Sequence, residues 1–383
     1  MMRSPLFVAS ISAIALLGPC GKKDDDAKPA PSASVKAATV GTAAASTSAT
    51  PEKPKEVPFE EAVKASKPLD IKTADQDAAG SKITAEVCTV EGGPFVHKSG
   101  MDVLRSIRAI GDRVFTVNDD AAVHAYKLDP GPKCKLTIDK TFGEGGVAKF
   151  KNKIDRLSAD SAGNLFATNG VFASYRVDKD GKQVFECTGR PLGYLFVNPS
   201  GKGGIGTFAN ATVSKVTLDA KGCKTEPWVF QDLSTDDKRK GNLTNAQAVG
   251  YVGDTIFVGG KLAKSADPNE SNVVLGLDQA GKEKVRLGKT DKDYASKDRF
   301  GWVHAIGPCK TGVCVLDSNY RRLTIWKTDG KFVASVDLSA LFGLKYPWIA
   351  DFDRNKTHTF FVAGQDRDVK GVAEGNIYRV SGL

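Results

Sequence analysis

The sequence predicts an all-β fold, a six-bladed β-propeller, for residues 81–383. Short runs of β-branched and aromatic residues recur there between Gly, Asp and Asn turns, and no long stretch has the apolar period of a helix. The runs group into comparable units spaced by about 40 to 50 residues, which is the period of propeller blades. Strand-like runs at this period predict a ring of blades.

Each unit contains a recognisable second strand, of which the third unit's is the poorest match. The six second strands are expected at 113–118, 164–169, 203–208, 255–260, 312–317 and 359–364. A third strand follows in every unit, at 122–129, 174–177, 213–219, 273–278, 323–327 and 377–380. In all units but the sixth, a turn such as Asp180-Gly181 then leads to a fourth strand.

The sixth unit lacks a fourth strand of its own, because the chain ends at Leu383. The alternating segment 83–90 precedes the first unit and has no other place in a blade. We therefore expect strand 83–90 to close the last blade, which leaves no exposed sheet edge at the junction of the two ends.

Residues 1–19 are typical of a signal peptide, with Arg3 before an apolar run at 6–17 that is too short to span a bilayer. A buried core helix is the alternative, but a dense polar stretch follows at 21–26. The segment ending in Cys20 resembles the lipobox of bacterial lipoproteins, although Pro19 departs from the usual small residue. That resemblance implies an exported chain, lipid-anchored through Cys20 to a membrane of the cell envelope, on the periplasmic side or the cell surface.

Residues 20–80 are rich in Ala, Ser, Thr, Pro and Lys and predict a disordered linker, because they bury too little apolar surface to offset chain entropy. A short helix is also compatible with 59–66. A flexible tether of this length has a reach on the order of 40 Å.

The seven cysteines leave an even number once Cys20 is assigned to the lipid. In an oxidising compartment the rest can form disulfides, and Cys309 and Cys314, which flank a Lys-Thr-Gly turn, are the favoured pair. For the other four, the sequence leaves all pairings open: Cys88, Cys134, Cys187 and Cys223. A zinc site is the weaker reading, since no Cys-x-x-Cys occurs and the four histidines are scattered.

Residues 313–333 resemble an NHL repeat, with Asp317, Asn319 and Trp326 ahead of the Asp329-Gly330 turn. Residues 160–169, continuing to 180–182, are a degenerate version. The resemblance implies an NHL-like six-bladed propeller and says little about activity, because this fold carries enzymes and binding proteins alike.

Motifs for common chemistries are missing or misplaced. The sequence contains no Gly-x-Ser-x-Gly elbow and no His-Glu-x-x-His motif. Residues 201–206 match a dinucleotide-binding glycine pattern, but no βαβ unit surrounds them, so we expect a hairpin. Asp178 and Asp180 lack the remaining ligands of a calcium loop and predict a turn. The net charge of +9 is spread over interspersed Lys and Asp, so we expect solvated loops and no specific nucleic-acid partner.

A ligand site is expected where the segments leading into the innermost strands gather at one mouth of the channel. An apolar wall and directional polar groups there suit a sugar or a peptide: Tyr194, Trp302, Tyr346 and Trp348 for the wall, and Arg105, Arg156, Arg299 and Asp155 for the polar contacts, with His304 beside them. The competing interpretation makes the tryptophans interblade core residues and His304 a structural group.

The sequence thus favours a monomeric scaffold that binds an envelope polysaccharide, a peptide or a protein partner, and it names no cofactor. The alternative is a metal-dependent hydrolase or lyase at the central channel. Amidating lyases and gluconolactonase-type enzymes use related propellers, with metal ligands from several blades. Here the histidines do not recur at equivalent blade positions: His97, His124, His304 and His358.

Overall fold

The structure is a computed structural model that describes residues 82–93, 95–97, 104–118, 121–170, 173–188, 193–207, 213–219, 222–229, 243–262, 272–288, 298–344, 347–365 and 373–383. All of them belong to one compact unit, Glu56–Leu383. The predicted signal peptide, Cys20, the linker and the short helix at 59–66 lie outside the described residues. Within the described part, no helix is long and apolar enough to cross a bilayer.

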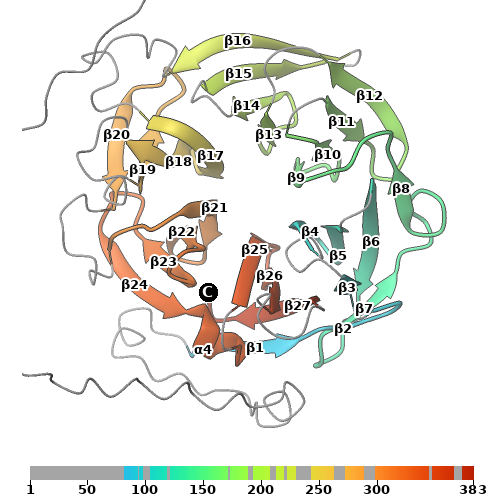
Figure 1. Cartoon of the computed structure of the whole chain (residues 1–383). Helices are drawn as coiled ribbons and strands as arrows, with labels where there is room; N and C mark the ends of the chain where they lie inside the picture. The colour runs from blue at the N-terminus through green and yellow to red at the C-terminus, as the bar shows by residue number, and fades with distance from the viewer. Residues whose placement is uncertain are drawn as a thin grey trace, which may run out of the picture. The chain divides into compact units, whose positions relative to one another are not determined.

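Six sheets, each built on four antiparallel strands, are arranged as the blades of a ring (Figure 1), as the sequence predicted. Blade one holds β4 (Ser106–Ile110), β5 (Arg113–Val117), β6 (Ala122–Leu128) and β7 (Lys135–Ile138), and blade two holds β9 (Arg156–Ala159), β10 (Leu165–Thr168), β11 (Ala173–Val177) and β12 (Gln183–Thr188). Blade three holds β13 (Tyr194–Val197), β14 (Gly203–Thr207), β15 (Val213–Leu218) and β16 (Cys223–Val229), and blade four holds β17 (Leu243–Val252), β18 (Thr255–Leu262), β19 (Asn272–Leu277) and β20 (Glu283–Leu287). Blade five holds β21 (Val303–Cys309), β22 (Gly312–Asp317), β23 (Arg322–Trp326) and β24 (Phe332–Asp337), and blade six holds β25 (Pro347–Arg354), β26 (Thr359–Gln365), β27 (Ala373–Ser381) and β1 (Thr84–Val87). Every second strand and third strand expected from the sequence lies in its predicted place.

Two short strands and one helix were not predicted. β3 (Phe95–His97) pairs with β27, and β8 (Val147–Lys149) pairs with β6. The helix α4 (Leu338–Phe342) follows β24. Its N-cap is Asp337, whose side chain accepts from two backbone N–H groups, and it ends at Gly343 with a positive φ of 67°.

The closing segment divides between two blades. β1 pairs antiparallel with β27 and completes blade six, whereas β2 (Thr89–Val90) pairs in parallel with β7 of blade one. The prediction that all of 83–90 closes blade six therefore needs correction. Between the two strands, Cys88 is bonded to Cys134. Glu86 adds to the junction, since it accepts from Arg379 Nε at 2.6 Å and from Cys134 N at 2.9 Å. Blades six and one are thus joined by main chain, a disulfide and a carboxylate.

The core lies between blades. Each hydrophobic cluster draws on two neighbouring blades, as where Phe115 and Phe142 of blade one pack with Tyr175 of blade two. Second strands are covered on both faces, so β10 and β14 are buried along their whole length. This two-sided burial explains why second strands are continuously apolar instead of alternating.

Two further disulfides are present. One joins Cys187 on β12 to Cys223 on β16, the outer strands of blades two and three. The other joins Cys309 to Cys314, the pair that the sequence favoured, within the hairpin of blade five. The pairings that the sequence left open are thus set by which outer strands the ring brings together.

The two ambiguous motifs are turns. Asp178 Oδ1 accepts from the backbone N of Asp180 at 3.0 Å and of Lys182 at 2.9 Å, which is the bonding of a tight turn. The glycine run at 201–206 ends the turn after β13 and forms most of β14 in a hairpin, with Asn198 N donating to Gly203 O. The predicted hairpin at 201–206 and the predicted turn at Asp178 and Asp180 are both confirmed.

Candidate ligand-binding mouth of the ring

The innermost strands follow one another around the channel in the order β4, β9, β13, β17, β21 and β25, and β25 packs again on β4. Neighbouring inner strands run in the same direction, because β25 places Asp351 beside Ile107 and Asp353 beside Ala109. All six therefore begin at one end of the ring, which we call the amino mouth. The predicted site residues lie at or before the beginnings of these strands.

Side-chain hydroxyls connect the inner strands. Ser106, which is 0% exposed, donates to Asp351 Oδ2 at 2.5 Å and accepts from Leu157 N at 3.0 Å, so it links blades six, one and two. Ser158 repeats the arrangement towards blade three, since it donates to the Leu195 carbonyl at 2.9 Å. Inner strands of different blades share no backbone ladder, so these bonds fix their register.

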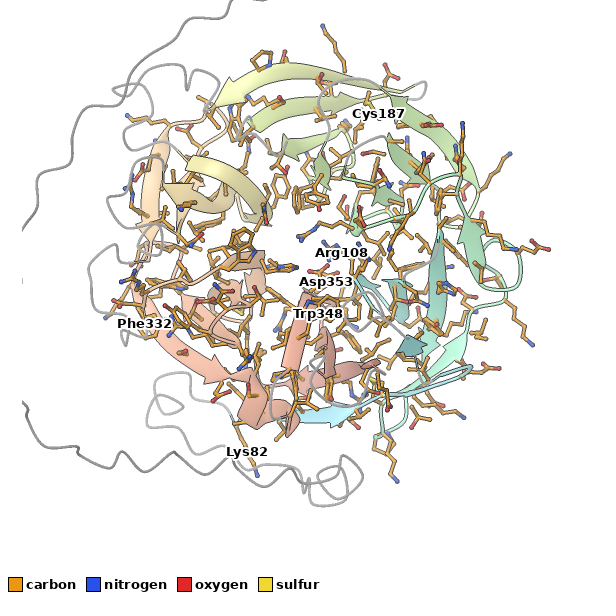
Figure 2. The ribbon with its side chains drawn as sticks, in the orientation of Figure 1. Lys82, Arg108, Cys187, Phe332, Trp348 and Asp353 are labelled. Atoms are coloured by element: carbon orange, nitrogen blue, oxygen red, sulfur yellow. A yellow bond between two sulfur atoms is a disulfide. The ribbon has the colours of Figure 1, made fainter. Side chains whose placement is uncertain are left out.

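Charged pairs surround the axis. Arg105 Nη1 lies 2.5 Å from Asp155 Oδ1, and Arg108 Nη1 lies 2.8 Å from Asp351 Oδ2. Figure 2 labels Arg108 and Asp353 close together near the centre of the ring. Burial raises the pKa of Asp353 to about 6, although the positive charge of Arg108 and the N–H of Ala109 oppose that shift. The axis is therefore lined by charged groups that are largely buried, where electrostatic contacts are stronger than in bulk water.

Arg156 and His304 meet across the channel. Arg156 stacks over the ring of Tyr194, with its guanidinium carbon 5.1 Å from the ring centroid, and donates to the carbonyl of His304 at 3.1 Å. Burial and the neighbouring charge of Arg156 lower the pKa of His304 to about 4, despite the opposing carboxylate of Asp351. The imidazole is therefore neutral at pH 7 and has one ring nitrogen able to accept a hydrogen bond.

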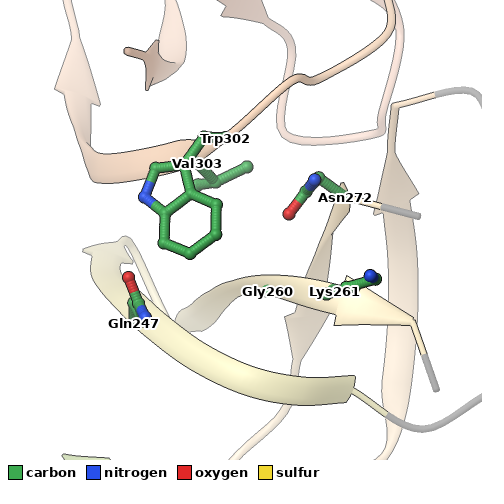
Figure 3. Close-up of a pocket in the computed structure, with 6 residues that line it drawn as sticks. All are labelled: Gln247, Gly260, Lys261, Asn272, Trp302 and Val303. Carbon is green, nitrogen blue, oxygen red and sulfur yellow. The ribbon is translucent and has the colours of Figure 1, made fainter. Parts of the chain in front are cut away.

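A small hollow of about 10 Å³, partly open to solvent, lies between blades four and five at the amino mouth (Figure 3). The residues that line it are Gln247, Gly260, Lys261, Asn272, Trp302 and Val303. Asn272 is 7% exposed and donates through Nδ2 to the carbonyl of Gly301 at 2.7 Å. Figure 3 shows its side-chain oxygen turned into the hollow, towards the indole of Trp302. The hollow thus combines an aromatic face with a buried acceptor.

The backbone leading to Trp302 is held by a buried carboxylate. Asp317, which is 0% exposed, accepts from Gly301 N at 2.9 Å and from Trp302 N at 3.1 Å. Burial raises the pKa of Asp317, while these N–H groups and Arg322 oppose the shift. Asp317 is the last residue of β22, so the end of this strand positions the loop that presents Trp302.

The predicted site residues divide into three groups. Five of them converge around the axis: Arg105, Asp155, Arg156, Tyr194 and His304. Trp302 lines the separate hollow, whereas Trp348 packs against the core between blades six and one. Arg299 is 0% exposed, and its carbonyl accepts from Arg322. Tyr346 lies outside the described residues.

Sequence reasoning missed several polar residues of the mouth: Ser106, Arg108, Asn272, Asp351 and Asp353. Asp351 and Asp353 alternate with apolar residues on β25, and that spacing on an inner strand was the available signal. Asn272 carried no signal, because it begins a third strand and reaches the mouth only through the packing of blade five on blade four. Within the described ranges, no three His, Cys, Asp or Glu side chains are grouped so as to hold a metal ion.

Comparison with known proteins adds little to this geometry. No family model matches the chain, and no curated protein matches it. Among solved structures, the β-propeller domain of Cps50 (Swd1) from Myceliophteria thermophila aligns at 14% identity and a TM-score of 0.44, covering 73% of this chain and 98% of that one. The computationally designed Ika8 protein aligns at 11% identity and a TM-score of 0.41, covering 76% and 74%. These likenesses concern the fold alone.

Proposed function

We propose that this chain is an exported lipoprotein of a bacterial-type cell envelope, whose NHL-like propeller binds a sugar, a peptide or a protein partner at its amino mouth. Residues 1–19 are the signal peptide, Cys20 carries the lipid, 20–80 form the tether, and 81–383 are the binding domain. The protein acts as a monomer on the periplasmic side or at the cell surface, and its membrane contact is the anchor. No specific nucleic acid is its ligand.

Export is supported by the cysteines of the folded domain. All six of them are bonded in pairs, and such bonds persist in oxidising compartments such as the bacterial periplasm. The charged, apolar and small-residue pattern of residues 1–19 provides the matching route out of the cytoplasm.

Binding is carried by one observation: the half-buried indole of Trp302 lines a hollow beside the inward-facing oxygen of Asn272. An aromatic face packs on the apolar face of a sugar ring or on a peptide side chain, and a fixed acceptor orients a hydroxyl or an N–H of the ligand. The proposed contact residues are Arg105, Asp155, Arg156, Tyr194, Trp302, His304 and Trp348.

The anchor is tested by expressing the full chain in a bacterial host and measuring the mass of its mature N-terminal peptide. A diacyl or triacyl modification at Cys20, lost in a Cys20→Ala variant, is the expected result. A mature chain that retains residues 1–19, or that begins beyond Cys20 without lipid, contradicts this part of the proposal.

Binding is tested with the purified full chain on arrays of envelope polysaccharides and peptides. Trp302→Ala should abolish capture, whereas Trp228→Ala should leave it unchanged, because Trp228 lies on the outer strand β16. Equal capture by both variants contradicts a site at the hollow. The absence of any captured ligand on either array contradicts a sugar or peptide ligand.

A further inference from the structure

Arg156 is a buried cation that reaches across the channel. It begins β9 of blade two, is 8% exposed, and donates through Nη1 to the carbonyl of His304 on β21 of blade five. In Figure 1, β9 and β21 lie on opposite sides of the ring. The guanidinium therefore lies near the ring axis, at the level where the inner strands begin.

The surroundings of Arg156 do not supply an ion pair. Its planar group lies over Tyr194 and over Phe196, with the guanidinium carbon 5.6 Å from the second ring centroid. The carboxylates nearby are engaged with other cations, Asp155 with Arg105 and Asp351 with Arg108. Among the described residues, no carboxylate lies within ion-pair distance of Arg156.

This arrangement leaves hydrogen-bonding capacity unused. A guanidinium has five N–H donors, and the only bond from Arg156 within the described part of the chain goes to a neutral carbonyl. The carboxylate of Asp351 is already bonded to groups other than Arg156. Its Oδ2 accepts from Ser106 and Arg108, and its Oδ1 accepts from Phe352 N. A buried charge without a bonded counter-charge is unfavourable, so an incoming anion would relieve it.

The charges around Arg156 also bear on whether an anion would bind there. Burial lowers the pKa of its guanidinium, and the nearby charge of Arg108 adds to that shift, while Asp351, Tyr194 and Asp155 oppose it. Two guanidiniums thus act on each other at the axis, and only Arg108 has a carboxylate bonded to it. Planar guanidiniums bind carboxylate and phosphate groups through paired N–H donors.

We propose that Arg156 is the centre of an oxyanion site on the ring axis, which binds a carboxylate or phosphate group of the ligand with Arg108 beside it. The inference deepens the proposed function and rests on it in one respect, that the ligand enters by the amino mouth. It does not require the Trp302 hollow. The ligand would be an acidic sugar, a phosphorylated glycan or the C-terminus or acidic side chain of a peptide.

The test uses the purified full chain and two probes, inorganic phosphate and acetate, titrated by calorimetry against chloride at constant ionic strength. We expect saturable binding of at least one probe, weakened at least tenfold in Arg156→Met. Arg176→Met is the matched control, because Arg176 also lies on blade two over two rings, those of Phe166 and Phe185. Its affinity should equal that of the wild-type chain. Binding of phosphate but not acetate assigns a phosphate ligand, and binding of both assigns the wider oxyanion class.

A second measurement needs no variant. Arginine Nε–Hε signals of the wild-type chain, recorded by NMR during the phosphate titration, should shift for Arg156 and stay fixed for Arg176. No saturable binding of either probe, or unchanged affinity in a folded Arg156→Met chain, overturns the inference. A chain that captures a neutral sugar through Trp302 but binds neither probe overturns the oxyanion site and leaves the proposed function standing. Phosphate binding at Arg156 without any array ligand supports the oxyanion site alone.

Discussion

The disulfide between Cys88 and Cys134 should stabilise this domain more than the disulfide between Cys309 and Cys314, because it closes a longer loop and joins the two ends of the ring. The first pair is separated by 46 residues and the second by 5. Cys88 lies between β1 of blade six and β2 of blade one. We therefore compare Cys88→Ala/Cys134→Ala with Cys309→Ala/Cys314→Ala.

The expected magnitude follows from loop closure in the unfolded chain. The chain-entropy relation gives about 4 kcal/mol for a loop of the first size and about 2 kcal/mol for the second. The Cys88 pair should therefore lose about 2 kcal/mol more free energy of unfolding than the Cys309 pair. Both double variants remove two sulfurs that are at least partly buried, so the difference between them reports chiefly the closure.

The assay is urea unfolding of the oxidised chain in a Cys20→Ala background, which removes the one cysteine outside the three pairs. Tryptophan fluorescence and circular dichroism should give coincident transitions, which licenses the two-state free energies. Equal losses of unfolding free energy in the two double variants, or a larger loss in the Cys309 pair, would refute the reasoning that the Cys88–Cys134 disulfide closes the ring.

Three further predictions test other parts of the ring. Ser106→Ala removes a fully buried hydroxyl that links three blades and should cost about 2 kcal/mol in urea unfolding, whereas Ser161→Ala, in an exposed turn, should cost under about 0.5 kcal/mol. Similar losses would contradict the bridging role. Gly181→Ala should destabilise the domain clearly more than Gly111→Ala. Both glycines have positive φ, but only at Gly181 would an added Cβ meet backbone, 2.3 Å from Gly143 N. Comparable melting temperatures of the two variants would refute this close approach. Because the unfolded chain protonates His304 near pH 6.5 and the folded chain only near pH 4, the wild-type domain should lose stability as the pH falls from 6.5 to about 4. His304→Gln should lack this loss. Parallel curves of stability against pH for the two proteins would contradict the prediction.

Much of the fold was predictable because a propeller repeats its local signal. Second strands are covered on both faces, and several follow a turn with a glycine at positive φ, such as Gly253 before 255–260, so these runs were recognisable without any knowledge of their neighbours. The closing segment was only half predicted. Its alternation marks a strand, but the change of partner at Cys88 depends on the geometry of the gap between blades.

The candidate site was less predictable, since its residues come from different blades. The sequence placed Arg156, Tyr194 and His304 at the beginnings of inner strands, and these do meet at the axis. It assigned Arg299 to the polar contacts of a ligand, and the structure shows that this side chain is fully buried. An arginine before a strand looks the same in sequence whether it points to solvent or into the junction with the next blade.

The sequence alone therefore determined the class of fold, the number of blades and the hairpin disulfide of blade five, because strand periodicity, glycine turns and short-range spacing are local properties of the chain. Only the tertiary structure decided the pairing of Cys88 with Cys134 and of Cys187 with Cys223, and the meeting of Arg156 with His304. These contacts join residues from different blades. Their geometry is set by how the sheets twist and close into a ring, which no single segment encodes.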